Sequence, residues 1–290
     1  MKLLSRFGRI GITLAAVAVA VFVGWRLWTY YMVEPWTRDG RVTADILGVT
    51  PDVSGLVADV LVHDNQPIKV GDVLFRIDRA RFDLAVRQAQ AVVASKLAAF
   101  QEAERENTRY QSLSNIAVSQ EKQQQTGATL AQASAAYQQS QADLGVARLN
   151  LERSEVKATV NGIVSNFDLR PGDYVTAGRA VFAMVDTDSL RVDGYFEETK
   201  LGAIHPGDPA TIRLLGGEPK LYGRVQSIAG GITDRERAAG PDLLANVTPT
   251  FAWVRLAQRI PVRVKLDAVP AGVNLIPGRT ATVIIHPTTH

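Results

Sequence analysis

The feature that most constrains the fold is a short sequence repeat whose two copies lie far apart in the chain. Residues 50–78 align without a gap on the segment 157–186 when they are shifted by 107 positions. The identical pairs are Val53 and Val160, Gly55 and Gly162, Val57 and Val164, Gly71 and Gly178, and Phe75 and Phe182. Each copy alternates β-branched or apolar residues with turn residues, and so few strands are not stable alone. We therefore expect the two copies to complete one β domain, as a scaffold rather than a catalyst.

The glycines that recur in the two copies are expected to supply a positive φ or a close backbone approach at turns. They are Gly55, Gly71, Gly162 and Gly178. The copies resemble the two halves of a lipoyl or biotinyl carrier domain, which presents a modified lysine on the hairpin between its halves. No lysine follows Asp78 at that junction, and Lys157 at the other junction has no carrier motif around it. A carrier subunit of a membrane-bound enzyme is therefore the weaker alternative, and it predicts a biotin or lipoyl mass adduct.

The segment 79–156 between the copies predicts an antiparallel α-helical hairpin. It contains no proline, and its only glycines are at 127 and 145, which favours long helices. Apolar and small residues recur every seven positions, as in a coiled coil. The seam residues are Phe82, Ala89, Ala103 and Tyr110 (interrupted by Lys96), Val86, Val93 and Phe100, then Leu130, Tyr137, Leu144 and Leu151 with Ala133, Ser140 and Ala147. We place the tip at 114–118 and the N-cap of the return helix at Ser119, so each arm reaches about 50 Å.

The N-terminus predicts a membrane anchor. A basic tip, residues 1–9, precedes the 24-residue segment 10–33, which is apolar apart from Arg26, and about 20 apolar residues span a bilayer. Trp25, Arg26 and Trp28 would lie at the membrane interface. The basic start places the N-terminus in the cytoplasm and the bulk of the chain in the periplasm of a bacterial inner membrane. The alternative is a cleaved signal peptide, because Ala18-Val19-Ala20 is similar to a cleavage site.

The rest of the chain predicts strands. Residues 34–49 form a lead-in strand, and 187–290 contain strand candidates separated by Gly/Pro-rich turns, which indicates a small antiparallel barrel with a membrane-proximal region. Within this part, 197–204 predict a short helix and 229–250 a long loop. In the strand candidate 260–266, Val262, Val264 and Leu266 would face the core while Arg263 and Lys265 face out. The overall fold class is multidomain α+β.

Composition and motif content argue against an enzyme. There is no cysteine, so thiolate metal sites and cysteine nucleophiles are excluded. The four histidines lie in separate predicted elements, the Glu197-Glu198 pair is adjacent rather than on one helix face, and there is no P-loop. A net charge of +3 gives no basic footprint for nucleic acid. We expect no catalytic residues, metal or cofactor.

The order of parts (anchor, split lipoyl-like domain, helical hairpin, barrel) resembles the periplasmic adaptors of efflux pumps, the membrane fusion proteins of the hemolysin-secretion type. The stretch 249–267 is similar to the corresponding segment of adaptors for p-hydroxybenzoic (aromatic carboxylic) acid efflux and of adaptors for major-facilitator pumps. The resemblance implies an inner-membrane transporter of either type, an outer-membrane channel, export of aromatic acids or drugs, and a trimeric or hexameric ring. It also implies a pump-docking role for Arg255, Arg259 and Arg263, for which a solvated strand face is the alternative.

The same resemblance implies channel contacts at the hairpin tip. In tripartite efflux adaptors an arginine, a leucine and a serine past the turn bind the channel, and Arg109, Leu113 and Ser119 match that order. The turn here is one residue shorter, so the register of Ser119 stays open. The alternative is that Leu113 is a hairpin-core residue and Ser119 an N-cap. An adaptor for type I protein secretion is a further alternative, although such adaptors usually have much longer arms.

Overall fold

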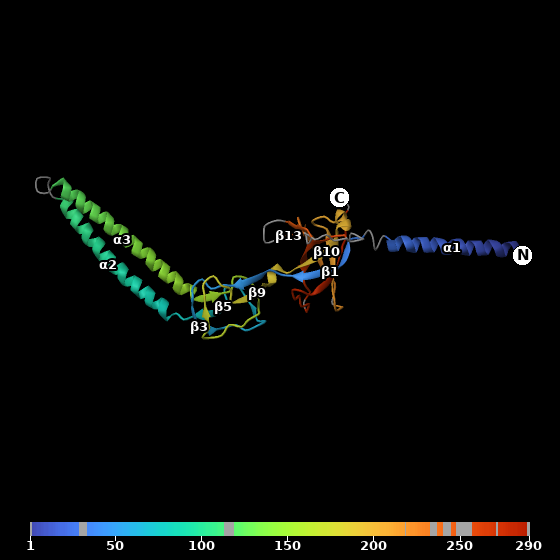
Figure 1. Cartoon of the computed structure of the whole chain (residues 1–290), viewed down its shortest axis with the longest axis horizontal. Helices are drawn as coiled ribbons and strands as arrows, with labels where there is room; N and C mark the ends of the chain where they lie inside the picture. Colours follow the sequence, from blue (N-terminus) through green and yellow to red (C-terminus); the bar gives the residue numbers. More distant parts are fainter. Residues whose placement is uncertain are drawn as a thin grey trace. The chain divides into compact units, whose positions relative to one another are not determined.

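The computed structural model describes residues 2–28, 34–112, 119–217, 219–232, 237–239, 245–247, 257–270 and 272–288. The chain divides into two units by its internal contacts (Figure 1). One unit is continuous, Ile46–Asp188, and contains the repeat and the helical hairpin. The other joins Met1–Asp45 to Ser189–His290 and contains the barrel. The chain therefore starts one unit, builds the other, and then returns.

In the continuous unit the two copies of the repeat interleave in two four-stranded sheets. One sheet has the order β2-β9-β7-β4 and the other β6-β5-β3-β8. The strands are β2 (Ile46–Val49), β3 (Gly55–Val60), β4 (Pro67–Ile68), β5 (Val73–Ile77), β6 (Glu155–Lys157), β7 (Gly162–Ser165), β8 (Tyr174–Val175) and β9 (Phe182–Asp186). Each sheet takes two strands from either side of the hairpin, so neither copy forms a sheet of this kind alone.

The strand registers preserve the repeat. Gly55 pairs with Val175 and Ile68 pairs with Gly162, two pairings that the 107-residue shift interconverts. The strands β2 and β6 continue this relation, because Val49 pairs with Phe182 as Val156 pairs with Phe75. The structural repeat therefore begins at β2, inside the segment 34–49 that the sequence predicted as a lead-in.

The repeated glycines fall into two classes that match between the copies. Gly71 and Gly178 have φ of 91° and 81°, values at which a side chain is strained. At Gly55 an added Cβ would collide with the Ile77 side chain, and at Gly162 with the Val185 backbone carbonyl. The expected positive φ and the expected close approach therefore both occur, at different positions of each copy.

The hairpin consists of α2 (Ala80–Ser112) and α3 (Gln120–Arg153), which lie side by side (Figure 1). The predicted seam is present, with one local change: Leu97 is half-buried in it, whereas Lys96 is exposed. The Phe100 and Tyr137 rings stack across it with centroids 5.9 Å apart. The helices are therefore paired along their length as the heptads predicted.

Ion pairs attach the base of the hairpin to the sheets that hold it. Arg153 at the end of α3 pairs with Asp52, and Arg79 before α2 pairs with Glu155 at 3.0 Å. Arg81 also donates a hydrogen bond to the Ser54 carbonyl. These contacts connect both helices to the β domain at the point where the chain enters and leaves it.

The second unit contains a closed six-stranded antiparallel barrel of order β1-β10-β15-β12-β11-β16. Its strands are β1 (Trp36–Thr43), β10 (Arg191–Glu197), β11 (Pro209–Leu214), β12 (Leu221–Ile228), β15 (Arg259–Ala268) and β16 (Thr280–Ile285). As predicted, Val262 and Val264 are fully buried, Leu266 packs against the core, and Arg263 and Lys265 are exposed. The barrel is closed by β1, which pairs with β10 and β16. In the sequence, the whole continuous unit Ile46–Asp188 separates β1 from the other five strands.

Short elements complete this part of the chain. The 3-10 helices η2 (Thr187–Ser189) and η3 (Glu198–Ala203) precede and follow β10, and η3 takes the place of the predicted short helix. The predicted loop 229–250 was wrong in one respect, because it contains the paired strands β13 (Arg237–Ala239) and β14 (Ala245–Val247).

The N-terminal segment forms the helix α1 (Lys2–Trp28). From Leu14 onward it exposes large apolar side chains, including Phe22, Trp25 and Trp28, and Arg26 lies in its last turn. Across the described residues, no helix combines the length and the mean hydropathy that a membrane crossing requires. The membrane-spanning segment predicted for 10–33 is therefore not confirmed.

Candidate functional site

The distal end of the hairpin gathers cations around one aromatic ring. Tyr110 lies in the last turn of α2 with the Arg109 guanidinium 5.5 Å from its ring centroid. The Lys122 ammonium of α3 also lies 5.5 Å from that centroid. An aromatic face attracts both cations, so the end of the hairpin presents two positive groups held by one ring.

A shallow hollow of about 560 Å³ lies beside this cluster on α2, lined by Glu104, Arg105, Thr108, Arg109 and Ser112. Arg105, which lines the hollow, donates a hydrogen bond of 2.6 Å to Glu102. That hydrogen bond, with the charges of Arg105 and Arg109, lowers the pKa of the Glu102 carboxyl. The outer surface of the hairpin end is therefore charged and polar.

The structure locates two of the three residues predicted for the hairpin tip. Arg109 is exposed on the last turn of α2. Ser119 is the N-cap of α3, and its side chain accepts a hydrogen bond from the Lys122 N–H at 3.3 Å. Leu113 and the predicted turn 114–118 lie outside the described residues. The N-cap prediction for Ser119 is confirmed, whereas its contact with a channel stays a prediction.

The sequence reading missed the roles of Tyr110 and Lys122 at this site. Tyr110 was predicted only as a residue of the heptad seam, and no role at the tip was predicted for Lys122. The sequence did contain a signal for this contact. Tyr110 and Lys122 each lie a few residues from the predicted turn, on the two facing helices, so an antiparallel hairpin brings them together. The side-chain geometry that makes them a cluster with Arg109 appears only in the structure.

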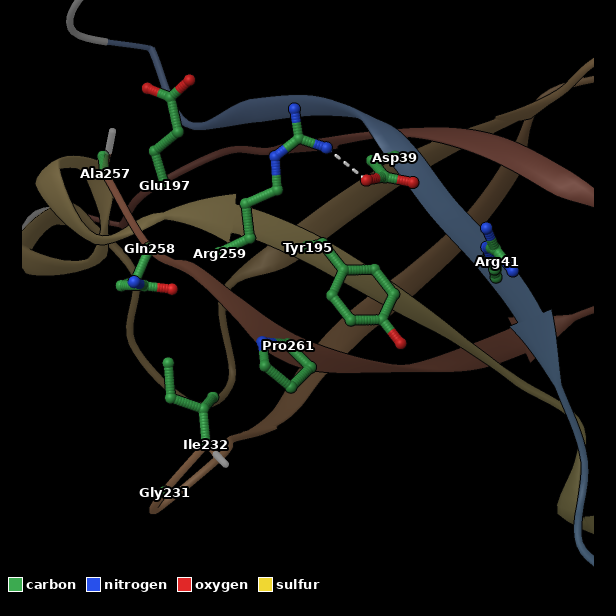
Figure 2. A pocket seen from close by; sticks show the side chains of 10 residues that line it. All are labelled: Asp39, Arg41, Tyr195, Glu197, Gly231, Ile232, Ala257, Gln258, Arg259 and Pro261. Atoms are coloured by element: carbon green, nitrogen blue, oxygen red, sulfur yellow. Dashed lines mark hydrogen bonds and ion pairs between the residues drawn. The ribbon is translucent and has the colours of Figure 1, made fainter. Parts of the chain in front are cut away.

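A second candidate surface lies on the outside of the barrel. A hollow of about 1060 Å³ lies over the strands β1, β10 and β15, and Figure 2 shows the side chains that line it. The Tyr195 ring and Pro261, which pair across β10 and β15, are flanked by an ion pair between Arg259 and Asp39. The lining residues are Asp39, Arg41, Tyr195, Glu197, Gly231, Ile232, Ala257, Gln258, Arg259 and Pro261.

The predicted pump-docking arginines are partly neutralised by acids of the same barrel face. Arg259 pairs with Asp39, and Arg263 lies 3.8 Å from Asp193. Arg255 lies outside the described residues. The face therefore carries a mixed pattern of positive and negative charges.

The described residues contain no grouping suited to metal binding. No cluster of three or more His, Asp or Glu side chains that could hold a metal occurs in the part of the chain that the structure describes. The buried Asp208 carboxylate has a structural role, because it accepts hydrogen bonds from the Thr288 hydroxyl at 2.7 Å and from the His205 N–H at 2.8 Å. Burial acts to raise the pKa of Asp208, but these hydrogen bonds outweigh it and the pKa is lowered.

Comparisons with known proteins agree with this geometry. Residues 45–187 match the family model described as RND MFP, barrel-sandwich hybrid domain, and residues 189–286 match the AAEA-like beta-barrel domain. The chain is 40% identical over 273 residues to the uncharacterized protein YdhJ of Escherichia coli K12, which covers 94% of this chain and 96% of YdhJ.

Solved structures share the fold. The membrane fusion protein Spr0693 of Streptococcus pneumoniae R6 has a TM-score of 0.64 at 18% identity, covering 88% of this chain and 99% of that one. MacA of Actinobacillus actinomycetemcomitans has a TM-score of 0.60 at 17% identity, covering 88% and 82%. A MacA-MexA chimera with the Pseudomonas aeruginosa MexA α-hairpin has a TM-score of 0.59 at 22% identity, covering 88% and 83%. At these identities the likeness concerns the fold alone.

Proposed function

The chain belongs to the membrane fusion protein family of periplasmic adaptors, and on that basis we propose that it links an inner-membrane transporter to an outer-membrane channel in a tripartite pump that exports small molecules. Members of this family are structural linkers and not enzymes. The observation that carries the proposal is the insertion of a hairpin between the halves of one β domain. Two helices of 33 and 34 residues reach about 50 Å from a base that the interleaved sheets hold.

The architecture supports a spacer function over a carrier function. In an intact carrier domain the two halves meet at a short turn that presents a lysine. Here Asp78 leads directly into α2, which begins at Ala80, and the strand β6 starts two residues after α3 ends. The place of the carrier turn is thus taken by the hairpin, and the chain offers no lysine there to modify.

The proposed partners follow from the two candidate surfaces. The hairpin end, with Arg109, Tyr110 and Lys122, would contact the outer-membrane channel. The barrel face with Arg259 and Arg263 would contact a transporter of the aromatic-acid exporter or major-facilitator type. The resemblance of 249–267 to adaptors for aromatic carboxylic acid efflux favours aromatic acids, and otherwise drugs, as the exported class. Several copies would assemble in a trimeric or hexameric ring, because one hairpin cannot enclose a conduit.

Attachment to the inner membrane is part of the proposal. The exposed apolar side chains of α1 and the basic residues that precede them support an association of this helix with lipid. Extraction of cell membranes with alkaline carbonate tests it, since an attached chain stays with the membrane pellet. Full release of the chain by carbonate would contradict attachment through α1.

Export is the decisive test of the function. A strain that lacks this chain should accumulate its substrates, and a panel of aromatic acids and cationic drugs identifies the class. Re-expression of the chain should restore efflux, and cross-linking in intact membranes should recover one inner-membrane transporter and one outer-membrane channel. Unchanged accumulation of every compound, together with a biotin or lipoyl adduct in the intact mass, would favour the carrier alternative.

A further inference from the structure

One sheet of the continuous unit has an uncharged row of side chains on its outer face. In the sheet β2-β9-β7-β4, Ile46 pairs with Val185, Val185 pairs with Ile163, and Ile163 pairs with Pro67. The alternate residues of β4, β7 and β9 are buried in the core, so these four side chains point outward. They form one apolar row across all four strands.

The rest of this face is typical of a sheet that is covered on both sides. A sheet with one face in water alternates apolar residues with polar ones, yet the next outward row consists of the small, uncharged residues Gly48, Ala183 and Ser165. Ile46 leaves 66% of its surface exposed, and Pro67 is exposed too. The described part of the chain thus leaves the apolar row partly open to water, and such a patch marks an interaction surface.

The other sheet carries the counterpart of this row at the equivalent positions of the repeat. Leu56 pairs with Tyr174 across β3 and β8, and the 107-residue shift relates this apolar pair to Ile163 and Pro67. Leu56 is 51% exposed and Tyr174 is 62% exposed. The place beside Leu56 belongs to Asp78, whose N–H donates to the Leu56 carbonyl. The apolar surface of this sheet is therefore the pair alone, where the first sheet has a row of four.

The apolar row and the apolar pair face in different directions. Both sheets bury their inner residues in one core, where Phe75 of β5 meets Phe182 of β9. The outer faces of two sheets that pack in this way point away from each other, and the sheets themselves lie about 10 Å apart. One copy of the chain therefore cannot place its apolar pair on its own apolar row, whereas two neighbouring copies can.

We propose that the apolar pair of one copy packs on the apolar row of the next copy, with the Tyr174 ring against Pro67. The inference rests on the ring of the proposed function. A ring that closes by rotation is built from a head-to-tail contact, in which each copy presents two different surfaces. The two sheets supply one such surface each, and their contact buries no charge, so it avoids the cost of desolvating ions.

A face-to-face contact is the competing arrangement. Two apolar rows packed on each other would use the same surface of both copies, and such a contact closes as a dimer. It would also leave Leu56 and Tyr174 of both copies in water. The head-to-tail contact covers both surfaces in every copy, which is why the exposure of the apolar pair favours it.

Disulfide cross-linking distinguishes the two arrangements. The chain has no cysteine, so Pro67→Cys and Tyr174→Cys supply every thiol in the full-length protein. Under mild oxidation in cell membranes, the double variant should give a ladder of covalent multimers beyond the dimer, and each single variant should stay monomeric. A disulfide within one copy requires Cα atoms within about 7 Å of each other, which is less than the spacing of the sheets. Dimers from either single variant would show the face-to-face contact and overturn the proposal.

A matched control moves one thiol to the far edge of the same sheet. Pro67→Cys combined with Lys157→Cys keeps the thiol of the apolar row and places the other on β6, which lies at the opposite edge from β8. This variant should give no ladder. A ladder of equal yield would show that the copies collide at random, and it would overturn the proposal.

An amine-reactive cross-linker, applied to the cysteine-free chain, tests the ring separately. Multimers with this reagent, but no disulfide ladder in the double variant, would reject this interface and leave the ring intact, whereas no multimers by either method would reject the ring itself. Leu56→Glu places a charge in the proposed contact and should abolish the amine-linked multimers without a change in the thermal midpoint. Leu61→Glu, at a loop leucine that is 46% exposed, should keep them.

Discussion

Phe75 and Phe182 hold the same position in the two copies of the repeat, 107 residues apart, and their rings meet edge to face with centroids 6.2 Å apart. Both are buried, Phe75 completely. Each copy thus contributes one ring to a shared core, and Phe167 adds a third ring 5.0 Å from Phe182. The β domain that carries the hairpin is therefore complete only when the chain has returned from the hairpin to supply the second copy.

Truncation of either ring should destabilise this domain strongly. Phe75→Ala or Phe182→Ala is expected to lower the free energy of unfolding by about 3–5 kcal/mol, through lost burial and a cavity. The double variant should cost less than the sum, since the two rings touch. Urea denaturation monitored by circular dichroism measures these effects. Tyr174→Ala, at a side chain that is 62% exposed, is the control and should change stability by under about 0.5 kcal/mol; a comparable loss there would contradict the shared core.

Charge reversal at the hairpin end should impair export without unfolding the chain. Arg109→Asp removes one of the two cations around Tyr110 and places a carboxylate near Glu102 and Glu104. Efflux of the identified substrate and cross-linking to the channel should both fall, while the thermal midpoint moves by only a few degrees because Arg109 is exposed. Arg148→Asp, an exposed charge reversal in the other helix away from the tip, serves as the control. Unchanged export and cross-linking for Arg109→Asp would remove the tip from the channel contact.

Two glycines of the continuous unit should respond oppositely to alanine. Gly145 lies in the interior of α3 with nothing within 4 Å of an added Cβ, so Gly145→Ala should stabilise the hairpin by about 0.5–1 kcal/mol through helix propensity. At Gly162 an added Cβ would collide with the Val185 carbonyl, so Gly162→Ala should destabilise the sheets or shift β7 away from β9. Denaturation curves of the two single variants give the signs directly, and a neutral Gly162→Ala would show that the strands separate at no cost.

Asp208 should make the barrel unit sensitive to acid. Its folded-state pKa is lowered, so the stabilisation it supplies is present above the ordinary carboxyl pKa and is lost as pH falls through the folded value. Asp208→Ala removes the acceptor of the part-buried hydrogen bonds from His205 and Thr288 and should cost about 1–3 kcal/mol at neutral pH. The difference in unfolding free energy between parent and variant should shrink as the pH drops below about 4. A difference that stays constant across this range would show that the ionised carboxylate is not what stabilises the native state.

The control for the Asp208 prediction is an exposed aspartate of the continuous unit. Asp168 is exposed, with a side chain 89% accessible in its ion pair with Arg170. Asp168→Ala should therefore leave neutral-pH stability almost unchanged, because exposed pairs contribute little.

Most of the fold could be predicted from local pattern. The heptads predicted both helices of the hairpin, Ser119 was identified as the N-cap, and the alternation around Val262 and Val264 predicted the barrel strand. The pattern also misled in places. The heptad series placed Lys96 at a seam position, whereas Leu97 is the half-buried residue there. The paired strands β13 and β14 were predicted as part of a loop, because short strands in a polar segment carry no clear periodicity.

The candidate sites were less accessible from sequence. Arg109 was named, yet the cation cluster that it forms with Tyr110 and Lys122 depends on side chains from two helices. The pairing of Arg259 with Asp39 joins residues 220 positions apart. No local window relates such residues, because their contact depends on how the later strands return to β1 and close the barrel.

The sequence by itself determined that two copies of one β unit are separated by a helical hairpin, since the repeat and the heptads are properties of neighbouring residues. The tertiary structure decided how the copies interleave, so that Phe75 meets Phe182 and the apolar row forms across four strands. The physical reason is that strand exchange and register are set by complementary shape and by the hydrogen bonds of buried groups. These depend on residues far apart in the chain, and only the folded molecule brings them together.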